Sequence, residues 1–284
     1  MRILVTGDNG FIGTHLCKYL VSLGHEVFGM DIKRGQQDDI RKVENVRAIF
    51  EETKPEVVIH LAALAGVRNS LMAPDKYFET NVTGTYWVLL FAEKYKARVL
   101  VASSSSVYGN GGMGLKETLP CNHQLSPYAV SKKGTEMVCQ YFGDRIPVVV
   151  FRPFTVYGEN GRQDMVVAKM KQALEAGKPF TKFGDGSSAR GYTNVHDLCE
   201  GIESLIHYPM PDKDFQIFNL GGSELVTLNE LISIFRSKYP DLKVEEVKKP
   251  EVDPQMNMAN VDKIKQATGW QPKRNFKEEL LKII

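Results

Sequence analysis

The sequence predicts an α/β protein built on a doubly wound parallel sheet, with a smaller α/β lobe in its second half. Two observations carry this prediction. Short β-prone runs alternate with segments of helical apolar periodicity through the first half, and the first of these runs leads directly into a glycine-rich turn. Such alternation is typical of a parallel sheet covered by helices on both faces. At 284 residues the chain has room for one large domain or two modest ones.

The chain opens with a strand, a glycine turn and a helix. Residues 2–6 are mostly apolar and β-prone, and Gly7, Gly10 and Gly13 follow at three-residue spacing. Residues 11–23 then place apolar side chains at i, i+3 and i+4. Glycine lets a backbone approach a pyrophosphate closely, and the free N–H groups at a helix N-terminus attract its charge. This first unit therefore predicts a Rossmann-type dinucleotide-binding domain.

The second strand indicates which dinucleotide is bound. Residues 26–30 end at Asp31, about twenty residues beyond the glycines, where a carboxylate can accept both ribose hydroxyl hydrogen bonds. That carboxylate would repel a 2′-phosphate, so NAD is expected rather than NADP. Lys33 and Arg34 follow closely and offer a phosphate site instead, although a solvated basic turn is the favoured interpretation of these two residues.

The remaining elements of the first half follow in alternation. We expect a helix at 43–53, a strand at 57–60, a long helix from Pro74 towards Tyr95, a strand at 98–102, a helix from about Ser126 to Phe142 and a strand at 147–151. The segment between Asp31 and the first of these helices is short. One βα unit is therefore expected to be abbreviated.

Beyond Phe151 the alternation is looser. We expect helices at 164–176 and near 195–207, a strand at 215–220, and two more helical patterns flanking a Pro- and Asp-rich loop at 250–254; a glycine-rich stretch lies at 183–186. We assign residues 1–152 plus about 191–220 to the dinucleotide-binding domain. Residues 153–190 plus 221–284 then form the smaller lobe, which is expected to bind the substrate.

Composition excludes several classes of protein. Lysine plus arginine total 36 against 34 acidic residues, a net charge of +2, so nothing points to a nucleic-acid partner. The four cysteines are scattered without the spacing of a metal site, and no metal is expected. No apolar run approaches the ~18 residues of a membrane span, and Asp8 with its neighbouring glycines interrupts any signal-peptide core. We expect a cytoplasmic protein that does not associate with membranes.

The candidate chemistry lies near the predicted strand at 98–102. Tyr128 and Lys132 are four residues apart at the start of a helix and so share one face. A lysine ammonium there is expected to pull the tyrosine pKa below ~10, which makes Tyr128 a usable base near neutrality. The hydroxyl run 103–106 follows the strand and can hold the substrate oxygen, unless it is merely a polar strand-end turn. Tyr239 and Lys243 share the spacing, but an intervening proline breaks any helix.

Six motifs occur along the chain in a recognisable order. They are Gly7-x-x-Gly10-x-x-Gly13, Leu61-Ala62-Ala63, Asn81-x-x-Gly84, Ser103-Ser-Ser-Ser-Val-Tyr-Gly109, Tyr128-x-x-x-Lys132 and Arg152-Pro-Phe-Thr-Val-Tyr-Gly158. In this set and order the chain resembles the extended short-chain dehydrogenase/reductase family, and within it the nucleotide-sugar 4-epimerases. The resemblance continues through residues 215–222 to the closing segment 259–272.

The resemblance implies a role for individual residues. The catalytic group would be Ser104, Tyr128 and Lys132, with Ser105 close enough to be the alternative hydroxyl. The residues expected to bind NAD are Gly7, Gly10, Phe11, Ile12, Gly13, Asp31, Asp39, Ile40, Leu61, Ala62, Ala63, Asn81, Ser103, Tyr128, Lys132 and Pro153. Those expected to bind a nucleotide-sugar substrate, UDP-linked by analogy, are Ser104, Ser105, Thr155, Arg162 and Arg190. Family members commonly dimerise through the helices equivalent to 74–95 and 126–142.

The expected reaction is inversion at carbon 4 of the sugar. Dehydratases of this family carry an Asp-Glu pair just before Val-Tyr-Gly, and the related decarboxylases carry a glutamate, whereas this chain has Ser105-Ser106. What remains is oxidation to a 4-keto sugar followed by reduction on its other face, with NAD bound but not consumed. The alternatives are a dehydratase or reductase on the same fold, and a non-catalytic NAD-binding regulatory protein.

The sugar is less clearly indicated than the reaction. Residues 155–165 resemble the corresponding run of glucuronate 4-epimerases, in which the arginine equivalent to Arg162 can grip the sugar carboxylate. UDP-glucuronate/UDP-galacturonate is therefore slightly preferred over the alternative, UDP-glucose/UDP-galactose. Gln163 replaces the usual proline, and Gly191 replaces the aspartate common after Arg190. Arg162 equally suits a structural ion pair.

Overall fold

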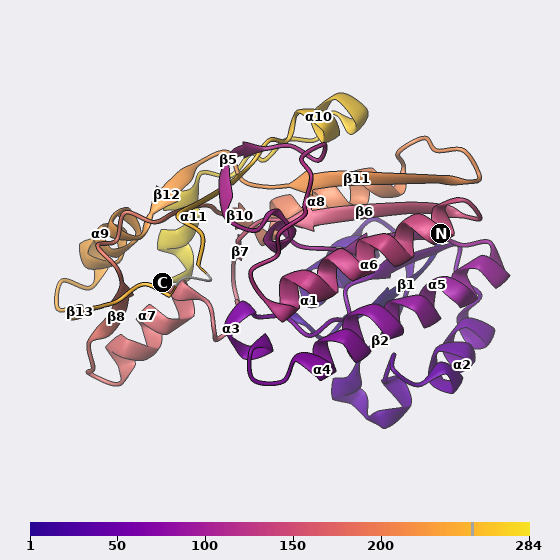
Figure 1. The fold of residues 1–284 in the computed structure, drawn as a ribbon, viewed down its shortest axis with the longest axis horizontal. Helices are drawn as coiled ribbons and strands as arrows, with labels where there is room; N and C mark the ends of the chain where they lie inside the picture. Colours follow the sequence, from indigo (N-terminus) through magenta and orange to yellow (C-terminus); the bar gives the residue numbers. More distant parts are fainter. Residues whose placement is uncertain (251–252) are drawn as a thin grey trace.

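The computed structural model describes residues 1–250 and 253–284, and its centre is a parallel sheet (Figure 1). Within the described residues this sheet has six strands, in the order β11 (Asp214–Leu220), β6 (Pro147–Pro153), β4 (Arg98–Ala102), β3 (Val57–His60), β1 (Arg2–Thr6) and β2 (Glu26–Met30). Every neighbouring pair is parallel. The predicted doubly wound α/β class is confirmed.

Helices cover both faces of the sheet, as its strand pattern requires. Along β1, Ile3 and Val5 point into one core with α1 (Phe11–Ser22) and α8 (Val195–Ile206). Leu4 points into the other core, with α2 (Val43–Thr53), α5 (Gly84–Tyr95) and α6 (Pro127–Gly143). Successive side chains of a strand face opposite sides, so a strand buried on both faces must be apolar throughout.

The helix predicted from Pro74 towards Tyr95 is not uniform. It consists of α4 (Pro74–Phe78), a π-helical turn η3 (Glu79–Thr83) and α5. At this turn the Asn81 carbonyl accepts hydrogen bonds from the hydroxyls of Thr85 and Thr135, at 2.6 and 2.7 Å. Two side-chain hydroxyls thus donate to a backbone carbonyl that would otherwise accept only within the helix. Local π-helical turns of this kind often lie at functional positions.

The region after β2 is abbreviated, as predicted. Only two 3₁₀ turns, η1 (Ile32–Arg34) and η2 (Gln36–Asp38), separate β2 from α2 in the described chain. Consequently β2 forms the edge of the sheet. The end of β2 is therefore covered by a short polar turn rather than by a further βα unit.

Three small sheets are formed by strands of the second half together with β5 (Gly111–Leu115) of the first half. The helices α7 (Val166–Glu175), α9 (Leu228–Lys238) and α11 (Phe276–Ile283) lie at one end of the molecule (Figure 1). The largest of the three sheets has the order β12 (Leu225–Thr227), β9 (Ala189–Gly191), β14 (Met256–Ala259) and β5. The pairs are β7 (Val156–Tyr157) with β10 (Thr193–Asn194), and β8 (Phe180–Phe183) with β13 (Val244–Val247). The remaining short helices are α3 (Val67–Ser70), η4 (Ser105–Tyr108) and α10 (Asp262–Thr268).

None of these small strands was predicted. They have two to five residues, and unlike the equally short buried strands of the central sheet, several are largely half-buried or exposed and so form no apolar run. The helices predicted at 164–176 and 195–207 are found as α7 and α8, shortened by one or two residues at their ends. Residues 251 and 252 of the predicted loop at 250–254 lie outside the described residues. Among the described helices, none combines the length and apolar character that crossing a bilayer requires.

Candidate active site

The glycine turn after β1 lies at the carboxyl end of the parallel sheet, where open α/β sheets bind ligands. Gly7 has φ +74°, and a Cβ there would lie 2.7 Å from the backbone nitrogen of Ala62. Gly10 is the N-cap of α1, and within the described chain no side chain caps this helix end. The close-packed backbone at Gly7 and the uncapped start of α1 support the predicted pyrophosphate contact of Gly7 to Gly13, which stays a prediction.

Asp31 at the end of β2 is held in place by backbone donors. Its two carboxylate oxygens accept hydrogen bonds from the amides of Lys33 and Asn9, at 2.9 and 3.1 Å. The side chain is buried to 7% exposure and is the N-cap of η1. Its position beside the glycine turn suits the predicted contact with an adenosine ribose.

The predicted adenine contacts, Asp39 and Ile40, have other partners in the chain itself. The Asp39 carboxylate is paired with the Arg41 guanidinium, and these hydrogen bonds hold the pKa of Asp39 below its ordinary value. Ile40 is buried in the core beneath Gly84, where a Cβ would lie 2.7 Å from the Ile40 Cδ1 atom. A role of this pair towards adenine stays a prediction.

Asn81 links the π turn to the loop after β3. Its side-chain amide accepts from the Leu64 N–H and donates to the Leu64 carbonyl, at 2.8 and 2.9 Å. It also donates to the Ser131 hydroxyl on α6. Leu61 to Ala63 lie between this anchored Leu64 and the glycine turn, where the Ala62 N–H donates to the Thr6 hydroxyl at 3.3 Å. Their contact with a cofactor stays a prediction.

Tyr128 lies in the first turn of α6, just inside its N-terminus. Ser126 caps this helix by accepting from the Ala129 N–H, and Pro127 occupies the first helical position. Burial raises the pKa of Tyr128, and the nearby Ser104 side chain opposes that shift. The Ser104 hydroxyl oxygen itself accepts from the N–H and the hydroxyl of Ser106, at 3.1 and 2.9 Å. Ser105 instead accepts from the Asn257 amide at 3.0 Å. The hydroxyl that faces Tyr128 is therefore that of Ser104.

Lys132 is only 4% exposed, and its ammonium donates to the Ala102 carbonyl at 2.7 Å. Burial lowers the pKa of Lys132 to about 8. The expected lowering of the Tyr128 pKa by this lysine was wrong for the protein chain alone. The Tyr128 pKa lies above its ordinary value because burial of the phenol outweighs the opposing effects.

Among the predicted sugar-side residues, Arg162 forms an ion pair with Asp164. The Nε–Oδ1 distance is 3.0 Å, and the pair lies against Gly66, where a Cβ would be 3.4 Å from the Asp164 Oδ2 atom. Both charges act on the pKa of Tyr128: Arg162 lowers it and Asp164 raises it. Arg162 is therefore close enough to act electrostatically on the candidate base Tyr128. Its pair with Asp164 is the structural ion pair that the sequence analysis gave as the alternative to binding a sugar carboxylate.

Arg190 lies on β9, and its guanidinium donates to the Ala189 carbonyl at 2.8 Å. Burial lowers the pKa of Arg190. The carbonyl of Thr155 accepts from the Thr193 N–H at 2.8 Å, which anchors the segment after β6 to β10. Phe11 and Ile12 lie in the first turn of α1, and Ser103 directly follows β4. Pro153 is the last residue of β6, which extends two residues beyond the predicted strand at 147–151. The contacts of these residues with NAD stay predictions.

Comparison with known proteins agrees with this geometry. Residues 3–221 match the NAD dependent epimerase/dehydratase family. The chain belongs to this family. It is 32% identical to a UDP-glucuronate 4-epimerase of Thermodesulfobacterium geofontis, over 99% of this chain and 94% of that one.

Solved structures of family members have the same fold. The chain is similar to the UDP-glucuronic acid 4-epimerase from Bacillus cereus, solved in complex with UDP-glucuronic acid and NAD, with a TM-score of 0.88 and 28% sequence identity. The match covers 100% of this chain and 98% of the Bacillus cereus chain. The UDP-glucose 4-epimerase from Thermotoga maritima, with UDP-glucose, has a TM-score of 0.89 at 28% identity and covers 99% and 96%. The family resemblance stated from the motifs is confirmed.

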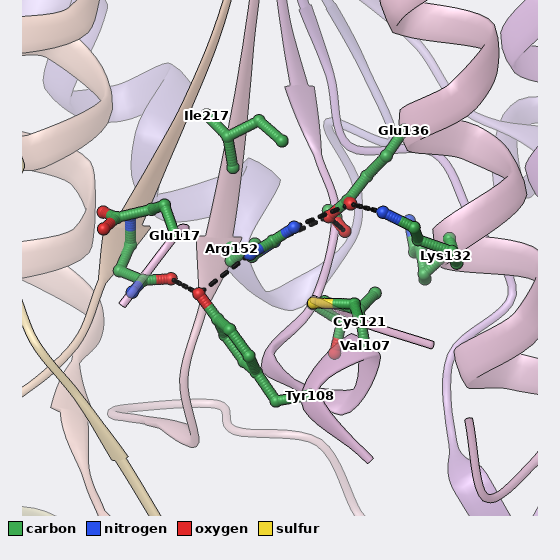
Figure 2. A network of polar contacts seen from close by, with 12 residues as sticks. Val107, Tyr108, Glu117, Cys121, Lys132, Glu136, Arg152 and Ile217 are labelled. Carbon is green, nitrogen blue, oxygen red and sulfur yellow. Dashed lines mark hydrogen bonds and ion pairs between the residues drawn. The ribbon is translucent and has the colours of Figure 1, made fainter. Parts of the chain in front are cut away.

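The structure contains a buried ion pair, Glu136 with Arg152, that contacts the serine run 103–106 through Ser103. The sequence analysis did not identify this pair. Glu136, one turn beyond Lys132 on α6, accepts from Arg152 of β6 at 2.7 and 2.8 Å (Figure 2). The Ser103 hydroxyl donates to the same carboxylate at 2.7 Å. Burial alone would raise the pKa of Glu136, but the hydrogen bonds from Arg152 hold it below its ordinary value.

The network continues from Arg152 to the other end of the serine run. Arg152 donates to the Tyr108 hydroxyl at 2.9 Å, and Tyr108 donates to the Asn219 Oδ1 atom on β11 at 2.8 Å (Figure 2). Residues 103 and 108, which flank Ser104 and Ser105, are thus both tied to one buried charge pair. The sequence signal for this ion pair was an acidic residue, Glu136, among the residues of α6 that face the core.

Asn257 on β14 is a second residue that the sequence did not indicate. It pairs in register with Arg190 of β9, and its amide nitrogen contacts Ser105. Its side-chain oxygen is buried and has no hydrogen-bond partner within the described chain. Because 152 residues separate Asn257 from Ser105, no local pattern could have joined them. The described residues contain no group of three or more His, Cys, Asp or Glu that could hold a metal ion.

Proposed function

We propose that this protein inverts the configuration of a UDP-sugar at carbon 4, with NAD bound and regenerated in each turnover. The observation that carries the proposal is the placement of Ser104 just after β4 and of Tyr128 and Lys132 on α6, with the Lys132 ammonium on the Ala102 carbonyl at the carboxyl end of β4. Residues 105 and 106 are serines, which have no suitable pKa for eliminating water. The names of the relatives support the same reaction.

In this proposal the chain positions the sugar hydroxyl and moves one proton. Ser104 holds the oxygen on carbon 4, and Tyr128 takes its proton during oxidation and returns it during reduction. When bound, NAD supplies a reversible acceptor for the hydride of carbon 4. Lys132 keeps a positive charge next to the reacting groups and binds the nicotinamide ribose. The 4-keto sugar must turn over between the two steps, so the sugar side of the site has to leave it room.

We also propose that the division into two lobes follows function. Residues 1–152 plus about 191–220 would hold NAD, and residues 153–190 plus 221–284 would hold the sugar nucleotide. Arg190 and Asn257, neighbours in the small sheet, support this division because Asn257 reaches Ser105. Arg190 would bind the phosphates, for which a guanidinium fork is well suited.

For the sugar we propose UDP-glucuronate, slightly ahead of UDP-glucose. A carboxylate at carbon 6 needs a cation in a partly desolvated site, and Arg162 lies within electrostatic reach of Tyr128. The Thermodesulfobacterium relative and the Bacillus cereus structure are named for the uronate. The similar Thermotoga structure contains UDP-glucose, which is the alternative substrate.

One experiment tests the reaction and the sugar together. The purified protein is mixed with UDP-glucuronate or with UDP-glucose, without added NAD, and inversion at carbon 4 is followed by NMR. We expect the galacturonate isomer to form, and to form faster than galactose forms from UDP-glucose. A keto or deoxy product would indicate a dehydratase, and no turnover of any UDP-sugar would favour a regulatory NAD-binding protein.

We further propose that the protein is a homodimer whose interface is formed by α5 and α6. These helices pack side by side (Figure 1), and α6 presents Met137 and Tyr141 with exposed fractions of 63% and 56%. Phe78, Tyr86 and Val130 add exposed apolar surface on the same helices and on α4. Met137→Glu should convert a dimer into a monomer in light scattering, whereas a monomeric wild-type protein would reject the proposal.

A further inference from the structure

The glycine turn carries a buried acid that dinucleotide binding does not require. Asp8 lies between Gly7 and Gly10 and is only 7% exposed. Its carboxylate is paired through both oxygens with the Arg34 guanidinium, with an Nη1–Oδ1 distance of 2.9 Å. Arg34 lies three residues beyond Asp31, so this pair connects the phosphate-binding turn to the end of β2.

The neighbouring backbone makes room for the pair. Gly29 lies within β2, and a Cβ there would collide with the Asp8 carboxylate and the Arg34 guanidinium. Glycine inside a strand weakens the strand and often marks a close approach by another group. The second basic side chain of this turn, that of Lys33, donates to the Asn9 carbonyl at 2.7 Å. Both cations therefore fold back onto the glycine turn.

This arrangement bears on the choice between NAD and NADP. An arginine near the end of the second strand is the group that accommodates a 2′-phosphate, whereas an acid there binds the ribose hydroxyls. This chain has both, in Asp31 and Arg34. A guanidinium binds phosphate best through two parallel N–H donors, and in Arg34 two nitrogens are already bonded to Asp8.

We propose that Asp8 is a specificity-determining residue for the dinucleotide: by holding Arg34 it keeps that guanidinium from a 2′-phosphate and leaves Asp31 to select NAD. This proposal deepens the proposed function, since it concerns the cofactor preference of the same site. It does not depend on which sugar is turned over. Without the Asp8 charge, Arg34 is free to turn towards the adenosine ribose that Asp31 is proposed to bind. The preference for NAD over NADP then weakens.

The test measures dinucleotide binding without any sugar, so its outcome is separate from that of the epimerase assay. Wild type, Asp8→Asn, Asp8→Asn/Arg34→Met and Arg34→Met are stripped of nucleotide, and the Kd of NAD and of NADP is measured by calorimetry. We expect Asp8→Asn to lower the ratio Kd(NADP)/Kd(NAD) about tenfold, the effect of one charge-assisted hydrogen bond. Adding Arg34→Met should restore the wild-type ratio.

The matched control is Lys33→Met, which removes the other cation of the turn and should leave the ratio of every variant unchanged. An unchanged ratio in Asp8→Asn, or a lowered ratio that persists in Asp8→Asn/Arg34→Met, overturns the proposal. Thermal unfolding checks that each variant is folded. If Asp8→Asn is not, Asp8→Ala in the same scheme gives the deciding ratio.

Discussion

Charged side chains are held differently on the two sides of the candidate site. On the proposed cofactor side, residues 1–152 plus about 191–220, Glu136 and Arg152 form an ion pair in which each side chain is 2% exposed. On the sugar side, the ion pair of Arg162 with Asp164 has exposed fractions of 36% and 39%. The first pair is shielded by sheet and helix, and the second lies in a loop that water reaches.

The difference indicates which side is preformed. Lys132, Glu136 and Ser103 are linked to backbone or to each other within the chain, so their positions do not depend on a sugar. If Arg162 meets a substrate carboxylate through its Nε and Nη2 atoms, as proposed, these donors must first release Asp164. The proposed catalytic geometry is therefore built into the cofactor side, whereas sugar selection by Arg162 would require an exchange of partners.

The largest effect should come from the base itself. Tyr128→Phe keeps the ring and its packing but removes the hydroxyl that faces Ser104. Because the cofactor side is preformed, folding and NAD binding should stay near normal. Turnover should fall by about 10²-fold or more, as expected for loss of general acid–base catalysis. Steady-state kinetics and NAD calorimetry check both halves of this prediction, and full turnover would reject the mechanism.

The next effect concerns stability and sets the two ion pairs side by side. Glu136→Gln leaves Arg152 buried without a charge partner, which should cost about 3–5 kcal/mol. Asp164→Asn breaks the exposed pair and should cost only about 0–1 kcal/mol. Urea unfolding of both variants measures the contrast. Equal losses would show that the cofactor side is no more rigidly built than the sugar side.

The sequence predicted the cofactor side better for the same physical reason. Strands buried on both faces are continuous apolar runs, and Gly7 and Ser103 directly follow such runs along the chain. The small sheet, by contrast, pairs β5 with β14, whose segments are over a hundred residues apart and five and four residues long. The direction of the Tyr128 pKa shift was wrong because burial arises only when distant segments pack together.

Sugar selection should show a smaller effect. If Arg162 binds the uronate carboxylate, Arg162→Ala should lower the preference for UDP-glucuronate over UDP-glucose by about 1.5–3 kcal/mol, the range of a charge-assisted hydrogen bond. Asp164→Asn should act in the opposite direction, because it frees Arg162 from its partner. The kcat/KM values for both sugars decide. A wild-type enzyme that prefers UDP-glucose would contradict the uronate assignment.

The last effect concerns the interior of the cofactor side, where His60 ends β3. Its ring nitrogens lie 2.7 Å from the Thr6 hydroxyl and 2.9 Å from the Thr85 hydroxyl, and burial lowers its pKa to about 3 from an ordinary 6.5. Between these pH values the unfolded chain binds a proton that the folded chain does not. Stability must therefore fall as the pH is lowered through this window, by about 1.4 kcal/mol per pH unit for this one group.

His60→Gln removes the titrating ring, so the stability gap between wild type and variant should narrow from pH 6 to pH 4 at that slope. Urea unfolding at half-unit intervals measures the gap. The result would assign part of the acid sensitivity to the buried cofactor side, because the exposed pair of Arg162 and Asp164 responds mainly to salt. Parallel curves for the two proteins would mean that His60 takes up its proton without unfolding, and that this part of the core is more open than its burial indicates.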